Sequence, residues 1–305
     1  MLNCKKAEPI LVVGSVALDT VQTPFGQAKE VLGGSATYFA LAASLFTPVR
    51  LLSVVGQDFP RKYLRRLQLH SIDLAGLQVL PGKTFRWTGR YRENMNEAET
   101  LSVCQNVLGQ FPEIPAHYRE SRFVFLANTD PLTQLKTLEA IEAPQMVACD
   151  TMNLWIRTQK TVLKKLLRKV NILIVNDSEA RMLTGKVNLP TAVWALLAHG
   201  PKTVIVKKGE HGVFLCTNGE LFAVPAYPLH QVVDPTGAGD SFAGGFLGYL
   251  ASQPRFTPRE IRRATVYGTV VASFTVEDFS TRRLEKITLK DVETRFQEMK
   301  RILKF

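Results

Sequence analysis

Short apolar runs rich in β-branched residues alternate along this chain with segments in which apolar residues recur at helical spacing. The runs predict strands at Ile10–Val13, Val49–Val55, Phe123–Leu126, Met146–Cys149, Ile172–Val175, Thr203–Lys207, Gly212–Cys216 and Leu221–Val224. The helical segments are Ser35–Phe46, Arg61–Leu69, Pro131–Ala143, Thr158–Lys169, Pro190–His199, Ala238–Ala251, Pro258–Val276 and Leu289–Ile302. Strands that are apolar throughout are buried on both faces. The pattern therefore predicts a doubly wound α/β fold, with a mostly parallel sheet and helices on both faces.

Two segments, residues 17–34 and 83–107, break this alternation. The first mixes Thr, Gln, Pro and Gly with weak strand character, and the second indicates a hairpin with a polar turn at Asn94–Glu97. If the two segments pair, they form a small β-sheet beside the main domain that acts as a lid. A lone surface hairpin is the alternative. Because no linker or internal repeat interrupts the chain, residues 1–305 are expected to form a single domain with this lid.

Composition and charge fit an ordinary globular protein. With 305 residues, 46% of them hydrophobic, and a mean hydropathy of +0.01, the chain can bury a large core. No apolar run is long enough to cross a bilayer and no signal peptide is evident, so a cytoplasmic location without a membrane partner is expected. The net charge of +11 is spread over predicted helix faces, which favours a protein that handles anionic substrates over one that binds nucleic acid.

The cysteines do not indicate a metal site or a disulfide framework. Cys4, Cys104, Cys149 and Cys216 are widely separated, and none has a partner at metal-ligand spacing. Cys149 and Cys216 lie in apolar runs and are expected to be buried thiols.

The most informative stretch is Asp234-Pro-Thr-Gly-Ala-Gly-Asp240, which leads into a helix rich in small residues. Gly237, Ala238 and Gly239 allow a tight turn, and the unpaired amides at a helix start attract an anion such as phosphate. A carboxylate beside such a site repels its anion, unless Asp240 takes a proton from an attacking hydroxyl. The alternative is an acidic first-turn residue that complements the helix dipole.

Two other glycine-containing stretches do not match nucleotide-binding motifs. Gly14-Ser-Val-Ala17 lacks the glycine spacing of a dinucleotide-binding turn. Gly82-Lys83-Thr84 resembles the end of a phosphate-binding loop, but the preceding Gly76 is at the wrong distance and a hairpin follows.

With the run Asp234–Asp240 at a strand-to-helix turn of an α/β domain, the chain resembles the ribokinase-like (PfkB) family of carbohydrate and nucleoside kinases. The run, followed by Ser-Phe-Ala-Gly-Gly-Phe, matches the C-terminal signature of that family, and the resemblance extends over essentially the whole chain. It implies an ATP-dependent kinase that transfers the γ-phosphoryl group to a hydroxyl of a small sugar, polyol or nucleoside. Asp240 would be the general base, and Gly237, Ala238 and Gly239 would form the anion hole.

Further matches imply nucleotide and metal contacts. Asn176 and Glu179 match an Asn-x-x-Glu motif that organises Mg²⁺ and phosphates, with Glu179 acting through water; a helix cap is the alternative. Residues 207–212 resemble a turn near the nucleotide, and a plain hairpin turn is the alternative. The nucleotide-binding candidates are Asn176, Lys207, Gly209, Gly212 and Thr236. Asp234 lies near the position at which some members bind a monovalent cation such as K⁺, and a structural role is the alternative.

On the acceptor side, the resemblance implies that Asp19 binds substrate hydroxyls, that Gly33-Gly34 is a hinge and that Asn153 lies near the sugar. Tyr38 stands where related sugar kinases often carry an Asn that binds acceptor hydroxyls, so a different hydroxyl pattern is expected. An inositol or nucleoside kinase is therefore an alternative to a simple sugar kinase, as is a non-catalytic protein that senses a nucleotide or sugar. An exposed lid sheet with one apolar face would also favour a homodimer.

Overall fold

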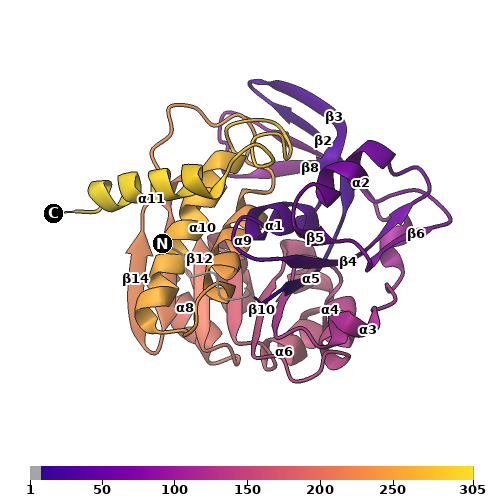
Figure 1. Cartoon of the computed structure of the whole chain (residues 1–305). Coiled ribbons are helices and arrows are strands. Elements are labelled where there is room, and N and C mark those ends of the chain that lie inside the picture. The colour runs from indigo at the N-terminus through magenta and orange to yellow at the C-terminus, as the bar shows by residue number, and fades with distance from the viewer. Residues whose placement is uncertain (1–7, 305) are drawn as a thin grey trace.

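The computed structural model describes residues 8–304, which form a layered α/β fold with a smaller β-sheet on one side (Figure 1). The central sheet has the strand order β14-β13-β12-β11-β10-β9-β1-β4-β5, and β6 also pairs with β4. Its strands are β1 (Ile10–Val13), β4 (Val49–Gly56), β5 (Ile72–Asp73), β6 (Leu77–Leu80), β9 (Phe123–Leu126), β10 (Met146–Asp150), β11 (Ile172–Asn176), β12 (Thr203–Lys207), β13 (Val213–Thr217) and β14 (Glu220–Val224). All pairings are parallel except those of β13 with β12 and β14. The predicted doubly wound, mostly parallel sheet is confirmed.

Helices cover both faces of the central sheet, because its strands alternate apolar side chains between two cores. Ile10 and Val12 of β1 point into one core, and Leu11 and Val13 point into the other. The first core is closed by α1 (Ser35–Ala43), α2 (Arg61–Gln68), α9 (Ala238–Ala251), α10 (Pro258–Thr275) and α11 (Leu289–Ile302). The second is closed by α3 (Ala116–Arg119), α4 (Pro131–Glu139), α5 (Asn153–Thr158), α6 (Lys160–Leu167), α7 (Asp177–Thr184) and α8 (Leu189–Leu197).

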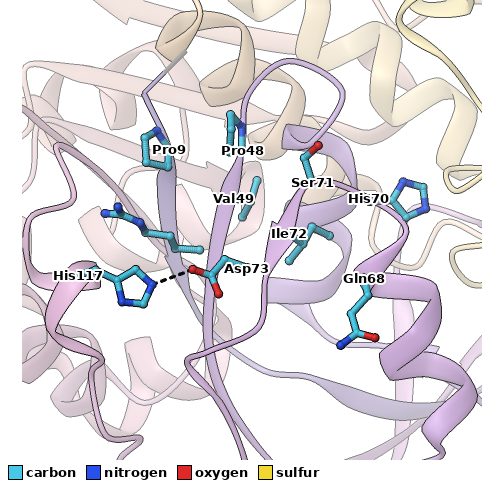
Figure 2. A pocket seen from close by; sticks show the side chains of 10 residues that line it. Pro9, Pro48, Val49, Gln68, His70, Ser71, Ile72, Asp73 and His117 are labelled. Carbon is cyan, nitrogen blue, oxygen red and sulfur yellow. Dashed lines mark hydrogen bonds and ion pairs between the residues drawn. The ribbon is translucent and has the colours of Figure 1, made fainter. Parts of the chain in front are cut away.

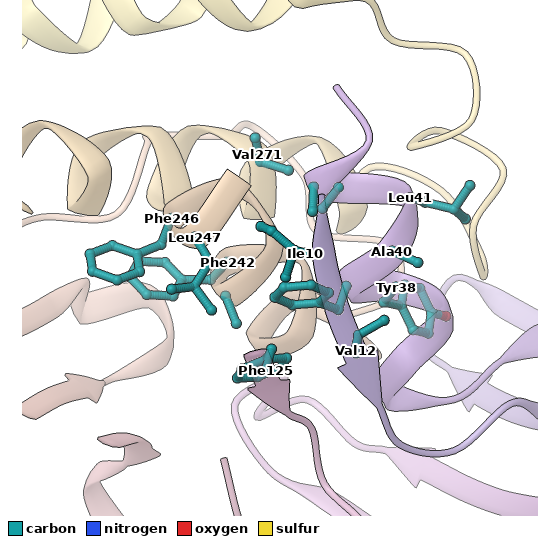
Figure 3. Close-up of a cluster of buried hydrophobic side chains, with 14 of the residues drawn as sticks. Ile10, Val12, Tyr38, Ala40, Leu41, Phe125, Phe242, Phe246, Leu247 and Val271 are labelled. Carbon is teal, nitrogen blue, oxygen red and sulfur yellow. The ribbon is translucent and has the colours of Figure 1, made fainter. Parts of the chain in front are cut away.

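Figure 3 shows the centre of the first core, where Tyr38 of α1 and Phe242 of α9 lie on either side of β1. Both side chains are almost fully buried, as are Ile10 and Phe125 between them. This packing fixes the start of α9 against α1, which matters because α9 begins at the run that carries Asp240.

The two segments that broke the alternation pair with each other to form a second, four-stranded sheet in the order β3-β2-β7-β8. Its strands are β2 (Ala17–Thr23), β3 (Gly26–Gly33), β7 (Arg86–Tyr91) and β8 (Ala98–Cys104), seen at the top of Figure 1. β2 pairs antiparallel with β3 and parallel with β7, so residues far apart in sequence are joined. The additional small sheet is confirmed, and a lone hairpin is excluded.

Several predicted boundaries were wrong. The helix expected at Thr158–Lys169 is α6, which begins only at Lys160 because Gln159 has φ −129°, and the short helix α5 before it was not predicted. α1 and α4 end earlier than expected, at Ala43 and Glu139. The strands β5 and β6, the helices α3 and α7 and the 3₁₀ turns at Asn106–Gly109 and Gly209–His211 were not predicted, because they are too short for a clear period.

Two expectations from composition can also be compared with the structure. Cys149 and Cys216 are buried free thiols, as predicted, whereas Cys104 is exposed and Cys4 lies outside the described residues. Within residues 8–304, no helix combines the length and apolar character needed to cross a membrane.

Candidate active site

The first turn of α9 carries the candidate anion site. Gly237 is the N-cap, with φ +77°, a conformation that favours glycine. The Ala238 amide donates to the Pro235 carbonyl at 3.1 Å, and the Ser241 amide donates to the Gly237 carbonyl at 2.8 Å. The amides of Gly239 and Asp240 lie between these two bonds, before the regular helical bonding begins. Within the described residues, the amides of Gly237, Gly239 and Asp240 therefore have no backbone acceptor, and of the expected set Gly237–Gly239 only the Ala238 amide is engaged.

Tyr38 lies directly against this turn. A Cβ added to Gly237 would lie 2.4 Å from carbons of the Tyr38 ring, and the Tyr38 side chain is only 2% exposed. Burial, with smaller contributions from Asp234 and Asp19, raises the pKa of Tyr38 well above its usual value. Tyr38 is therefore a neutral phenol packed on the signature turn, at the position where the sequence differs from related sugar kinases.

Asp240, Lys207 and Asp150 form a charged group at this helix start, in which Asp150 is buried and the other two side chains are partly buried. Lys207, the last residue of β12, lies with its Nζ 3.3 Å from Oδ2 of Asp150 at the end of β10. The same Nζ is 2.7 Å from the position that a Cβ on Gly239 would occupy, so the ammonium lies beside the open amides. A cation and a helix N-terminus together provide a positive site for phosphate oxygens.

The protonation of this group follows from its burial. Burial and, to a smaller extent, the charge of Asp150 raise the pKa of Asp240 to about 7, and Lys207 opposes the rise. Burial also raises the pKa of Asp150, against the effect of Lys207. Burial alone would lower the pKa of Lys207, but the carboxylates of Asp150, Glu179 and Asp240 outweigh it and raise that pKa. A carboxyl with a pKa near neutrality, such as Asp240, suits a general base.

Asn176 and Glu179 form the capping box of α7. The Asn176 side chain accepts a bond from the Glu179 amide, and the Glu179 carboxylate accepts one from the Asn176 amide, each at 2.7 Å. The helix-cap alternative is thus realised. Burial and the charge of Asp150 raise the pKa of Glu179 to about 8, and Lys207 and Asp240 also act on it, so the Glu179 carboxyl interacts with the same charged group.

The oxygen ligands at this site suit a hard cation that keeps most of its waters. Among residues 8–304, no cluster of three His, Cys, Asp or Glu side chains is arranged to hold a metal ion. Mg²⁺ commonly binds through one or two carboxylates, phosphate oxygens and water, so Glu179 and its neighbours fit a water-mediated magnesium site.

Asp19 lies in a pocket made by the two glycines. Its Oδ2 is 1.9 Å from where a Cβ on Gly33 would be, and a Cβ on Gly34 would lie 2.4 Å from the Ser15 carbonyl oxygen. Gly34 has φ +97°, and its amide donates to the Asp19 carboxylate. Burial raises the pKa of Asp19 to about 8. Gly33 therefore leaves room for the Asp19 carboxylate, and Gly34 allows the close approach of the Ser15 backbone.

The turn after β12 is held by the small sheet. Asn96, in the turn between β7 and β8, accepts a bond from the Glu210 amide at 3.1 Å and donates to the Glu210 carboxylate at 2.9 Å. A Cβ on Gly209 would lie 2.0 Å from the Asn96 side-chain oxygen. Gly212 instead packs on β14, since its Cβ would lie 2.0 Å from the Val224 carbonyl oxygen. Gly209 and Gly212 thus make room for close contacts within the protein.

A second contact joins the same hairpin to the signature run. The Thr236 hydroxyl donates to the Tyr91 hydroxyl at 3.4 Å.

Asp234 accepts bonds from the amides of Thr236 at 2.9 Å and Ser280 at 3.1 Å, and burial raises its pKa. These bonds use both of its carboxylate oxygens, which favours a structural role for Asp234.

The structure brings most of the predicted site residues together. Six of them interact electrostatically across the site: Asp19, Tyr38, Glu179, Lys207, Asp234 and Asp240. Asn153 opens α5 just beyond β10, and its buried side-chain oxygen has no protein partner. Sequence reasoning missed Asn96, whose only signal was a polar hairpin turn, and did not select Asp150.

The fold and this group of residues define a phosphotransferase: an anion site at a helix start, a lysine beside it, and a carboxyl with a pKa near neutrality. A family model described as pfkB family carbohydrate kinase matches residues 8–287, so the chain belongs to that family. The predicted activity, an ATP-dependent kinase that acts on a hydroxyl of a sugar or nucleoside, is confirmed at this level.

Similar proteins include nucleoside kinases. A cytidine kinase of Thermococcus kodakarensis is 33% identical over 80% of this chain and 90% of its own length. A nucleoside kinase of Methanocaldococcus jannaschii is 25% identical over 89% of this chain and 91% of its own length. A solved nucleoside kinase of Burkholderia thailandensis, in complex with inosine, has a TM-score of 0.79 at 18% identity and covers 95% of this chain and 98% of that one.

Proposed function

We propose that this chain transfers the γ-phosphoryl group of ATP, bound with Mg²⁺, to a hydroxyl of a nucleoside. The assignment of phosphoryl transfer is supported by the placement of Asp240 and Lys207 at the open amides of α9. Tyr38 favours a nucleoside over a simple sugar, because its phenol replaces an amide that would bind several hydroxyls. The relatives named as cytidine and nucleoside kinases support the same choice.

In the proposed reaction, the acceptor hydroxyl lies between Asp240 and the γ-phosphate. Its oxygen forms a bond to the γ-phosphorus, the bond from that phosphorus to the β–γ bridging oxygen breaks, and the hydroxyl proton passes to the Asp240 carboxylate. Lys207 and the amides of Gly239 and Asp240 stabilise the charge on the transferring oxygens. Bound Mg²⁺ would neutralise phosphate charge, held near Glu179 through water. Asp234, whose oxygens accept backbone amides, is assigned to the loop and not to K⁺.

An acceptor screen with Mg-ATP tests the substrate class. Cytidine, uridine, adenosine and inosine would be compared with ribose, fructose and myo-inositol by release of ADP. We expect kcat/KM for the best nucleoside to exceed that for ribose by about 100-fold or more, since a buried site built around a base rejects an acceptor that leaves it unfilled. Equal or higher kcat/KM for ribose or fructose would contradict the nucleoside assignment while leaving the kinase assignment intact.

The pH profile tests the protonation of Asp240. Below its pKa of about 7 the carboxyl carries a proton and cannot accept another, so activity falls as the pH is lowered. We expect kcat/KM for the acceptor to drop about tenfold per pH unit below 7 and to level off above it. The measurement is kcat/KM from pH 5.5 to 8.5 at saturating Mg-ATP, and a flat profile would contradict the assignment.

We also propose that the small sheet is a lid whose hairpin steadies the nucleotide side of the site. Asn96→Ala removes both bonds to Glu210, and net contributions of about 1 kcal/mol for such bonds predict a 3- to 10-fold rise in KM for ATP, with little change in melting temperature. Glu97→Ala, in the same exposed turn, is the control and should leave KM unchanged. Equal KM values for Asn96→Ala and wild type would show that the hairpin does not act on the nucleotide.

The lid sheet is also a proposed dimer interface. β8 is an edge strand whose residues are all exposed, including Leu101 at 40% and Val103 at 46%. Unprotected edges and exposed apolar side chains favour pairing with a second copy. Light scattering should give a dimer for the wild type and a monomer for Val103→Lys, and a monomeric wild type would overturn the proposal.

A further inference from the structure

A cavity of about 450 Å³ opens at the amino-terminal ends of β1, β4 and β5. It is lined by Pro9, Pro48, Val49, Arg50, Gln68, His70, Ser71, Ile72, Asp73 and His117 (Figure 2). Because β1 and β4 are parallel and the candidate active site lies beyond the carboxyl ends of the parallel strands, this cavity is at the opposite end of the sheet. Its volume falls within the usual range for small-ligand sites.

Among the described residues 8–304, Arg50 supplies a cation that forms no ion pair with a carboxylate. Among the ion pairs within residues 8–304, none includes Arg50. One of its terminal nitrogens donates to the Ser121 hydroxyl at 2.9 Å, and its guanidinium carbon lies 5.9 Å from the centre of the Tyr118 ring. These contacts orient a half-buried guanidinium and leave other N–H donors for a ligand.

The carboxylate in the cavity is already engaged. Asp73 Oδ2 lies 2.8 Å from His117 Nε2, and Asp73 Oδ1 accepts a bond from the Ala75 amide at 2.9 Å. These bonds outweigh its burial and lower the pKa of Asp73. Figure 2 shows the Asp73–His117 contact on the His117 side of the cavity. Asp73 is the register partner of Arg50 across β4 and β5, but within residues 8–304 no ion pair joins the two side chains, and both Asp73 carboxylate oxygens are engaged elsewhere.

Several other lining residues are apolar. Pro9 and Pro48 precede β1 and β4 and have no N–H group to offer, and Val49 and Ile72 are buried beside them. Burial lowers the pKa of His70, so its ring is largely neutral at pH 7. Within the part of the chain that the structure describes, the cavity therefore combines a guanidinium that makes no ion pair with apolar side chains.

We propose that this cavity binds a small organic anion, with a phosphate or carboxylate head group on Arg50 and a ring-sized body against Pro9 and Pro48. Guanidinium groups bind both head groups through paired, charge-assisted N–H bonds. Phosphate and carboxylate ligands would both bind in this way, and the choice of probe distinguishes between them. Arg50 lies outside the catalytic group, so the site can be occupied while the kinase site is in use.

The test uses ribose 5-phosphate, CMP and nicotinate as probes for the full-length protein saturated with Mg-ADP. Calorimetry measures affinity, and difference density from soaked crystals locates each probe. We expect density beside Arg50 with Kd of about 10⁻⁴–10⁻³ M. Density and binding for CMP or ribose 5-phosphate assign a phosphate ligand, and density and binding for nicotinate assign a carboxylate ligand.

Variants establish the role of the guanidinium. Arg50→Gln should weaken binding in the cavity about tenfold or more, because it removes the charge-assisted bonds, and should leave basal phosphorylation unchanged. Arg301→Gln makes the same charge change at an exposed position on α11 and should have no effect. Ser71→Asp, at an exposed position on the cavity rim, places a negative charge there and should also abolish binding even if Arg50→Gln folds poorly. Absence of all three probes from the cavity, or undiminished binding in Ser71→Asp and in folded Arg50→Gln, would overturn the proposal.

Discussion

Replacement of Asp240 by Asn should lower kcat by about 10²–10⁴-fold and leave the affinity for ATP nearly unchanged. The amide preserves the size of the side chain and its place in the first turn of α9. It cannot accept a proton, so the acceptor hydroxyl is no longer deprotonated as the phosphorus–oxygen bond forms. Removing a buried carboxyl whose pKa is raised by burial should not destabilise the fold, because its charged form is disfavoured there.

Steady-state kinetics with the best acceptor, together with calorimetric titration of ATP, measure this effect. Asp177→Asn, which changes an exposed carboxylate in the first turn of α7, is the matched control and should retain wild-type kcat. A kcat for Asp240→Asn within a few-fold of wild type would remove Asp240 from the reaction and restore the interpretation of a residue that only complements the helix dipole.

Replacement of Lys207 by Met should reduce both stability and activity. The change leaves the Asp150 carboxylate, 6% exposed, without its cation. Breaking a buried ion pair on one side costs about 3 kcal/mol or more, and protonation of Asp150 reduces this cost. Activity should fall further, by about 10²–10³-fold, since the ammonium beside Gly239 no longer balances charge in the transition state.

The double variant Lys207→Met/Asp150→Asn separates the two effects. A neutral amide no longer needs the cation, so urea denaturation should show most of the lost stability recovered relative to Lys207→Met. Activity should stay low, because no cation has been returned to the helix start, and Asp150→Asn alone completes the cycle. Recovery of kcat in the double variant would mean that Lys207 acts only by neutralising Asp150.

The sequence predicted the elements that have a clear period and the site residues that belong to a motif. β1, β9 and β12 match their predicted bounds because each is centred on a short apolar run with polar or turn-forming residues close by. α9 was located correctly because small residues after Gly237 mark its start. Asp240 could be selected before the fold was known, since a carboxylate at an anion site requires a chemical reason.

Features that depend on long-range contacts could not be predicted in the same way. The contact of Asn96 with Glu210 joins the lid hairpin to the turn after β12, and neither residue belongs to a motif. The Lys207–Asp150 pair requires that β10, β11 and β12 be neighbours in the sheet. The open amides at Gly239 and Asp240 depend on which carbonyl the Ala238 amide contacts, a detail of the turn that residue types do not determine.

The central claim is that this site transfers a phosphoryl group to a nucleoside hydroxyl with Asp240 as base. The most direct test is mass spectrometry of the nucleoside pool from the acceptor screen after incubation with Mg-ATP and either wild type or Asp240→Asn. The account predicts a nucleoside monophosphate formed in equal amount to ADP by the wild type, and about 10²–10⁴-fold more slowly by the variant. ADP formed without any phosphorylated nucleoside, or equal rates for the two proteins, would contradict it.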